Sequence, residues 1–496
     1  MNVNREVVVI GGGIGGLTAA ALLTKVGFSV TVLEASREWG GCAGKFNRGK
    51  YTFPVGATLG MGFEQGGVHE RILRFLGLDV EVQKLSTVMD VHFPHRTLTY
   101  YQNRQAHIAY LQKEFKGYES NIMSFYKEVE QIALEVRKLM AHLPILPPKT
   151  FAEWRKLVAA LEFSSLRLIP HFPQTFSALL KKHGLQGEKD FVHFIDGQLI
   201  DSMQTTSASC SLVLACLALD IYHEGAFYVK GGLYQVAEVL QMYIEDYGGK
   251  TLKGREAVRI ERKDNRWIIH DHRNNAYDAF HVVCNVPIQN LSTILDKDVY
   301  MKLTPKLRAK AKLPQWGTFT MYLAIKEEDL PSNLSLFQQI LLSEQGVMTE
   351  GEHIFVSISH PNDERRAPQG YRTITASTHI DLSKWQTREA YDQRKKIMEK
   401  KMIAGIKTLI PHIERAIHQI SGAPMAWERF TSRAHGGVGG FPQTLEHALF
   451  NSLSHRSGIN GLWLCGDTIF PGAGTIGASV SGYHVFQSIT EHKYTI

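Results

Sequence analysis

Cysteine is scarce in this sequence, and the few cysteines form no recognisable pattern. There are five, an odd number, scattered as Cys42, Cys210, Cys216, Cys284 and Cys465. They contain no CxxC pair and no Cys/His spacing typical of a zinc site, so we expect neither a disulfide framework nor a bound metal. This use of cysteine favours a reducing compartment, and we expect a cytoplasmic protein.

Long apolar runs are also missing. No run reaches the roughly 18–20 residues that cross a membrane, and the longest, CSLVLACLALDIY, is interrupted by Asp220. The first residues, MNVNREVVVIGGG, lack the basic, apolar and small-residue order of a secretory signal, so we expect none.

Arginine-rich runs with interleaved aromatic residues are absent too, and we expect no nucleic-acid partner. The formal charge is +7, from 55 basic and 48 acidic residues. That charge fits either a solvated, mildly basic surface or attraction to anionic lipid. The 496 residues, 44% of them hydrophobic, suffice for two or three domains with ample core.

Glycine, by contrast, is plentiful and gathers in the stretch REVVVIGGGIGGLTAAALLTKVGFSVTVLEAS. Glu6–Ile10 is a short continuous apolar run, as expected for a buried parallel strand. Residues 15–26 predict a helix, and Val30–Leu33 predicts a second strand that ends at Glu34. A GxGxxG pattern between two strands, with an acidic residue about 20 positions further on, strongly indicates a dinucleotide-binding site.

Each glycine of this pattern has a distinct expected role. Gly11 makes the tight turn, Gly13 lets the backbone approach a pyrophosphate, and Gly16 lets helix and strand pack closely. The N–H groups at the start of the helix attract the anion. Glu34 is expected to accept hydrogen bonds from ribose hydroxyls and to repel a 2′-phosphate.

The doublet Gly40-Gly41 indicates which dinucleotide binds. In FAD enzymes of the glutathione-reductase-like class, a Gly-Gly doublet at this place lets the backbone pass beside the cofactor, whereas an NAD dehydrogenase does not need it. We therefore predict FAD. The following PVGATLGMGF adds Gly56 and Ala57, where a flat ring can lie against the main chain.

A second strand–turn–helix pattern occurs in INGLWLCGDTIFPGAGTIGASVSGYHVFQSI. Leu462–Cys465 predicts a buried strand, Gly466-Asp467 a turn, and the small residues from about Thr475 a helix. We expect Asp467 to bind the ribityl hydroxyls or, through its backbone, the second phosphate. The N–H groups near Thr475 and Ile476 would face the flavin pyrimidine edge and stabilise negative charge there.

The two glycine-rich ends and two further motifs, GGCAGKFNRGKYTFPVGAT and FYVKGGLYQVAEVL, are collinear from residue 7 to 483. Together they resemble the family of phytoene desaturases, carotenoid cis–trans isomerases and retinol saturases. The GDTIFPGAG form is closest to the isomerase and saturase branch. Many relatives have arginine directly after the Gly-Gly doublet, where this sequence has Cys42. The motifs therefore do not decide to which branch of the family the sequence is most similar.

The resemblance implies an FAD-dependent oxidoreductase that desaturates, isomerises or saturates a carotenoid-like polyene or another long apolar substrate, with hydride exchange at flavin N5. A flavin amine oxidase that produces peroxide is an alternative, although that class usually keeps the arginine that Cys42 replaces. A non-enzymatic lipid-binding protein of the GDP-dissociation-inhibitor type is a third, and the intact glycine pattern with Glu34 argues against it.

The fold class that we expect is α/β: a Rossmann-like FAD-binding domain of the glutathione-reductase-like class with an inserted α+β substrate domain. Residues 1–90, 221–295 and 431–496 would form the FAD-binding domain, and residues 91–220 and 296–430 the substrate domain. The glycine-rich loop RAHGGVGGF lacks a strand–GxGxxG–helix context, so no separate NAD(P) domain is expected.

Residues 151–185 are both apolar and basic. They fit either a peripheral segment in a membrane interface or a pair of substrate-domain helices. The resemblance implies that this region admits lipid-soluble substrate from the bilayer.

No Ser-His-Asp or metal constellation is recognisable, and in polyene chemistry the flavin carries the reaction. The acid/base candidates are His435, beside the glycine-rich loop, and then Glu64. In this fold class the backbone of Val258 would pair with adenine. The complete set of residues expected to bind FAD is Gly11, Gly13, Ile14, Gly15, Gly16, Glu34, Ala35, Gly40, Gly41, Cys42, Ala43, Gly56, Ala57, Thr58, Val258, Gly466, Asp467, Gly474, Thr475 and Ile476.

Overall fold

A parallel sheet with strand order β10-β2-β1-β14-β20 organises one half of the molecule. The computed structural model describes residues 5–313, 316–385 and 387–496. The strands are β1 (Glu6–Ile10), β2 (Ser29–Glu34), β10 (Lys250–Lys253), β14 (His281–Cys284) and β20 (Leu462–Leu464). The apolar runs that predicted strands at both ends of the chain therefore lie in one sheet, with β14 between β1 and β20, as the Rossmann-like expectation requires.

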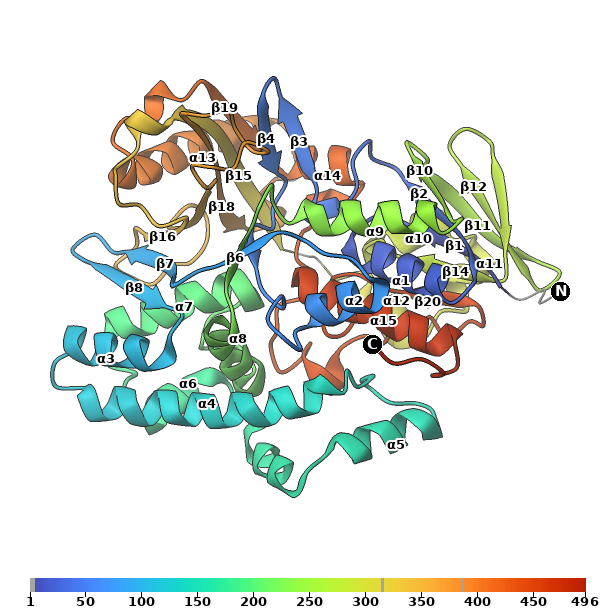
Figure 1. Ribbon diagram of the computed structural model, residues 1–496, viewed down its shortest axis with the longest axis horizontal. Coiled ribbons are helices and arrows are strands. Elements are labelled where there is room, and N and C mark those ends of the chain that lie inside the picture. Colours follow the sequence, from blue (N-terminus) through green and yellow to red (C-terminus); the bar gives the residue numbers. More distant parts are fainter. Residues whose placement is uncertain (1–4, 314–315, 386) are drawn as a thin grey trace.

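Helices cover one face of this sheet and a smaller sheet lies against the other (Figure 1). The helices are α1 (Ile14–Lys25), α2 (Val68–Leu76), α9 (Tyr234–Asp246) and α15 (Gly474–Ile489). The opposite face packs against β11 (Ala257–Lys263), β12 (Arg266–Asp271), β13 (Ala276–Ala279), α10 (Leu291–Ile294), α11 (Lys297–Met301) and α12 (Pro305–Lys310).

Helices α1 and α15 touch backbone to backbone. A Cβ atom added at Gly482 of α15 would overlap the carbonyl oxygen of Gly15 in α1. Similarly, a Cβ atom at Gly16 would overlap the carbonyl oxygen of Gly11, so the start of α1 packs closely against the turn that follows β1. The small residues at both chain ends therefore bring the two glycine-rich motifs together.

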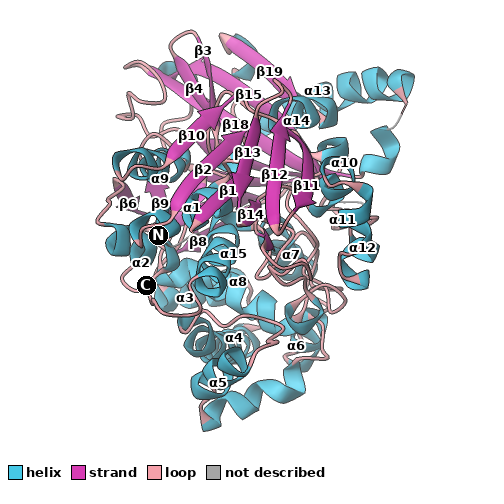
Figure 2. Cartoon of the chain, turned by 90° about the vertical axis from the view of Figure 1, so that its right-hand side faces the viewer, coloured by secondary structure: helices cyan, strands magenta, loops and turns pink. Residues whose placement is uncertain are grey.

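A second, larger sheet has strand order β19-β15-β18-β17-β16-β7-β8. Its strands are β7 (Thr87–His92), β8 (Thr97–Tyr101), β15 (Gly317–Lys326), β16 (Phe337–Leu341), β17 (His353–Ile358), β18 (Tyr371–Ile380) and β19 (His418–Gly422). Helix α13 (Arg388–Leu409) packs on one face, and α14 (Pro424–Thr431) follows β19 in the chain (Figure 2).

A layer of helices completes the molecule beneath this sheet (Figure 1). They are α3 (Arg104–Glu114), α4 (Glu119–Ala141), α5 (Phe151–Ala160), the 3₁₀ helix Phe163–His171, α6 (Phe176–Lys182), α7 (Lys189–Met203) and α8 (Leu212–Glu224). Within the described residues, no helix is both long and apolar enough to cross a membrane.

Short strands connect the two halves. They form the hairpin of β3 (Lys45–Arg48) and β4 (Tyr51–Pro54), and the small sheet of β5 (Leu59–Gly60), β6 (Val82–Lys84) and β9 (Phe227–Val229). The parallel sheet thus draws strands from residues 1–90, 221–295 and 431–496, and the second sheet from 91–220, 296–430 and the end of the first segment. The domain boundaries themselves stay a prediction.

The contact between α1 and α15 generates a stability prediction. We expect Gly482→Ala to lower the free energy of unfolding by about 1–3 kcal/mol, because the added methyl group forces the two backbones apart. Urea denaturation followed by circular dichroism measures this. Gly187→Ala is the control, since a Cβ atom there meets open space. Equal stability of Gly482→Ala and wild type would contradict the packing argument.

Candidate functional site

One cavity of about 1520 Å³ runs between the two halves of the molecule and collects residues from both. Its walls come from the start of α1, the loops after β2 and β20, the second sheet, and helices α4 and α8. The predicted residues that line it are Gly11, Gly13, Ile14, Gly15, Glu34, Ala35, Gly40, Gly41, Cys42, Ala43, Gly56, Ala57, Thr58, Gly466, Asp467, Gly474, Thr475 and Ile476.

The start of α1 has the geometry of an anion-binding turn. Gly11 has φ of 96°, which favours glycine, and Gly13 is the extended N-cap residue without a side-chain cap. A Cβ atom at Gly13 would come within 2.8 Å of Asn285 Nδ2. The first N–H groups of α1 are therefore free of a side-chain cap and open toward the cavity, where a phosphate can accept them.

The Glu34 carboxylate holds the glycine-rich turn in place. Its Oε2 accepts the backbone N–H of Gly12 at 2.6 Å, and its Oε1 accepts that of Ser36 at 2.7 Å. Burial raises the pKa of Glu34, while these two N–H groups act in the opposite direction. The carboxylate retains further acceptor capacity on the cavity side, as the expected contact with ribose hydroxyls requires.

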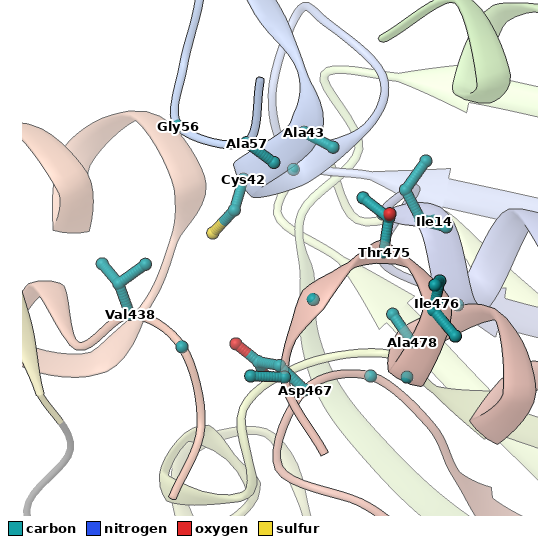
Figure 3. Close-up of a pocket in the computed structure, with 18 of the residues that line it drawn as sticks. Ile14, Cys42, Ala43, Gly56, Ala57, Val438, Asp467, Thr475, Ile476 and Ala478 are labelled. Atoms are coloured by element: carbon teal, nitrogen blue, oxygen red, sulfur yellow. The ribbon is translucent and has the colours of Figure 1, made fainter. Parts of the chain in front are cut away.

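At the other end of the cofactor region, Cys42 and Asp467 point into the same space (Figure 3). Between them lies Arg433, a buried residue that donates from its guanidinium to Asp467 Oδ2 at 2.6 Å and to the Gly437 carbonyl oxygen. Burial opposes the charge on Arg433, but Asp467 and then Cys42 outweigh it and raise the pKa of the guanidinium. Burial also raises the pKa of the Cys42 thiol.

The glycine-rich loop contributes Arg433 rather than His435. The backbone of His435 has φ of 56°, and its side chain is exposed and lies outside the cavity lining. Arg433, Val438 and Gly439 line the cavity instead. The expectation that this loop lines the channel thus agrees with the structure, but the loop presents a different side chain from the one chosen as acid/base candidate.

Of two further candidates, Val258 lies outside the cavity lining and Glu64 belongs to it. Val258 is 44% exposed and outside the cavity lining, which ends one residue earlier at Ala257. Glu64 does line the cavity, and one of its carboxylate oxygens is buried without a hydrogen-bond partner in the described chain. Burial raises the pKa of Glu64. Its role as the weaker acid/base candidate stays a prediction.

Asn285 connects the two glycine-rich motifs, and it is not among the residues predicted from the sequence. Its Nδ2 donates to the carbonyl oxygen of Gly11 at 3.1 Å, and its Oδ1 lies 3.5 Å from the sulfur of Cys465. The polar residue directly after the apolar strand HVVC was the signal that could have identified it.

The rest of the cavity is predominantly apolar. Helix α8, the end of α4 and the 3₁₀ helix supply this wall, with Val136, Met140, Leu168, Phe172, Val213, Leu217, Ala218 and Ile221. Phe470 closes it from the loop after β20. The cofactor region therefore continues into a chamber suited to a long apolar molecule.

The residues present fit FAD. Uncapped starts of α1 and α15 offer N–H groups at two separate places, as a molecule with a pyrophosphate and a flavin ring requires. Glycine and alanine residues leave the backbone accessible along the cavity wall between the starts of α1 and α15. Glu34 and Asp467 provide carboxylates for the sugar and ribityl hydroxyls.

Glu34 generates a binding prediction. We expect Glu34→Gln to weaken FAD binding by roughly tenfold or more, because one amide oxygen cannot accept both the Gly12 and Ser36 N–H groups. Fluorescence titration of the apoprotein with FAD measures the affinity. Glu389→Gln, an exposed position in α13, is the control. An unchanged affinity of Glu34→Gln would refute the organising role of this carboxylate.

The chain is similar to known proteins over most of its length. The chain is 25% identical over 493 residues to the chloroplastic prolycopene isomerase 1 of an Oncidium hybrid cultivar, covering 96% of this chain and 82% of the relative. It is 22% identical over 507 residues to the 4,4′-diapophytoene desaturase (4,4′-diaponeurosporene-forming) of Staphylococcus aureus, with 95% of each covered.

Among solved structures, an oxidoreductase from Methanosarcina mazei superimposes with a TM-score of 0.64 at 15% identity, over 97% of this chain and 100% of that one. Residues 14–489 match the family described as flavin containing amine oxidoreductase. The chain therefore belongs to the flavin-containing amine oxidoreductase family and is an FAD-dependent oxidoreductase.

Proposed function

We propose that this enzyme desaturates, isomerises or saturates a long apolar polyene of the carotenoid type. The observation that carries the proposal is the cavity of about 1520 Å³, which joins the predicted FAD residues to an apolar chamber walled by α4, α8 and the 3₁₀ helix. A relative that is a prolycopene isomerase and another that is a diapophytoene desaturase support the same substrate class.

When bound, FAD would exchange a hydride with the substrate at its N5 atom. The chain's own contribution is orientation and the exclusion of water. His69 Nε2 lies 3.0 Å from Thr475 Oγ1 and thereby fixes the start of α15. Burial lowers the pKa of His69 to about 4, so this histidine is neutral at pH 7 and positions the helix without adding charge.

Peripheral membrane association through residues 151–185 is part of the proposal. The outer surface of α5 and the 3₁₀ helix exposes a set of large apolar side chains, which we call the apolar patch: Phe151, Trp154, Val158, Leu161, Phe163, Leu166 and Ile169. Phe151 is 84% exposed and Phe163 is 91% exposed. Several exposed large apolar residues on one segment are typical of a surface that contacts another apolar phase.

The segment that carries the apolar patch also contributes to the cavity wall. Leu168 and Phe172 belong to the same segment and line the cavity from within. Helix α5 lies at an extremity of the molecule in both views (Figures 1 and 2). We infer that a substrate dissolved in lipid enters the chamber near this segment.

Lys182 pairs with Glu128 at 2.7 Å, so the electrostatic share of membrane binding is smaller than the lysine content suggests.

The first test is an absorbance spectrum of the purified protein, followed by anaerobic incubation with polyenes and with amines. We expect a flavin spectrum that a polyene bleaches if the reaction is a desaturation. If the reaction is saturation or isomerisation, product analysis after prior reduction of the flavin should show an altered polyene. Bleaching by an amine alone, with peroxide on admitting air, would refute the proposal and assign amine oxidase activity instead.

The apolar patch has its own test. We expect the double variant Phe151→Ser and Phe163→Ser to reduce binding to phosphatidylcholine–phosphatidylglycerol vesicles by at least about tenfold, because two aromatic side chains no longer enter the interface. Vesicle flotation measures this. The control is Met301→Ser, an exposed apolar residue of α11 outside the patch. Binding that is equal for both variants would contradict this docking surface.

A further inference from the structure

The second sheet presents two chemically different faces, because successive side chains of a strand point to opposite sides. The face toward α13 is apolar and includes Phe319, Met321, Ile374 and Ala376. On the other face, the register places Thr318 opposite His379 and Thr320 opposite Ser377, and all four residues line the cavity. The chamber therefore has apolar helical walls and a polar wall on the sheet.

A cluster of titratable side chains lies at this polar wall. We call it the Asp201 cluster; it consists of Asp201 at the end of α7 with Gln339, His353 and His379 from β16, β17 and β18. Gln339 Nε2 donates to Asp201 Oδ2 at 2.6 Å. The Nε2 atoms of His353 and His379 lie 3.5 Å and 3.8 Å from the carboxylate oxygens. Asp201 and His379 both line the cavity.

The hydrogen-bonding capacity of the Asp201 cluster is not used up within the protein. His353 is fully buried, and neither of its ring nitrogens has a hydrogen-bond partner in the described part of the chain. Buried polar groups without partners are costly, and native proteins usually pair them with protein, water or ligand. His353 itself lies outside the cavity lining; on the cavity side, Asp201 accepts one hydrogen bond from Gln339 and retains acceptor capacity that a purely hydrocarbon substrate cannot use.

The electrostatics of the cluster disfavour an anionic partner. Burial raises the pKa of Asp201 to about 7 and lowers the pKa of His353 to about 3 and of His379 to about 4. Both histidines are therefore neutral at pH 7, and the cluster holds no cation that would attract a carboxylate. A hydroxyl group can both donate to Asp201 and accept from a ring N–H of His379.

We propose that Asp201 and His379 form a binding subsite for a hydroxyl group carried by an otherwise apolar polyene. This inference rests on the proposed function and narrows its substrate class from hydrocarbons to polyenes with a neutral polar group. The apolar walls of α4 and α8 contact the chain of the substrate, and the polar wall recognises the hydroxyl. Gln339 holds the Asp201 carboxylate through its hydrogen bond, and the His353 ring lies beside it.

The test compares three ligands that share one polyene and differ at its end: all-trans-retinol with a hydroxyl, axerophthene with a methyl group, and retinylamine with an ammonium. Binding to the FAD-loaded protein is measured through the change in flavin absorbance under anaerobic conditions, so the readout does not need turnover. We expect retinol to bind about tenfold more tightly than axerophthene. We expect His379→Phe, which keeps a flat ring, to abolish that preference, and Asp201→Asn to reduce it.

Asp196→Asn is the matched control, because Asp196 is a buried carboxylate of the same helix that accepts the Ser207 N–H outside the cavity. It should keep the full preference for retinol. Equal binding of retinol and axerophthene, a preference that survives in His379→Phe, or tighter binding of retinylamine than of retinol would overturn the subsite. No binding of any polyene would overturn the proposed function and this inference together.

Discussion

The close approach of α1 and α15 is the constraint on which the rest of the structure depends. Their backbones meet at Gly15 and Gly482, where side chains on α15 have no room. That contact places the uncapped starts of both helices along one cavity, and Asn285 ties the two turns together from β14. The cofactor region is therefore defined by backbone atoms, and the side chains around it mainly keep those atoms in position.

Charges in the cavity are compensated close to where they arise. Arg433 donates to Asp467, and Glu34 is held by two backbone N–H groups. In a medium of low polarity an uncompensated charge is expensive, so such pairing lets polar groups lie beside an apolar chamber. The Asp201 cluster differs in this respect, because burial keeps its histidines neutral at pH 7 and raises the pKa of its carboxyl to about 7.

The sequence predicted best those features that local patterns encode. Strand–glycine–helix units at both ends were placed correctly, because turn geometry and helix starts depend on neighbouring residues. The roles of Arg433, Asn285 and Asp201 could not be derived in this way. The role of each depends on hydrogen-bond partners that are distant in the sequence, such as Asp467 for Arg433 and Gln339 for Asp201. His435 was chosen for its chemistry, but the loop conformation turns it outward.

The order of strands in the parallel sheet also bears on how the protein is made. Strand β14 needs β20 as its neighbour, and α1 needs α15, yet β20 and α15 are synthesised more than four hundred residues after β1. During translation the nucleotide-binding turn therefore leaves the ribosome long before its partners. The cofactor region can close only after synthesis of α15. Until then, apolar surface of β14 and α1 that these partners cover stays exposed, which is the kind of surface that chaperones protect.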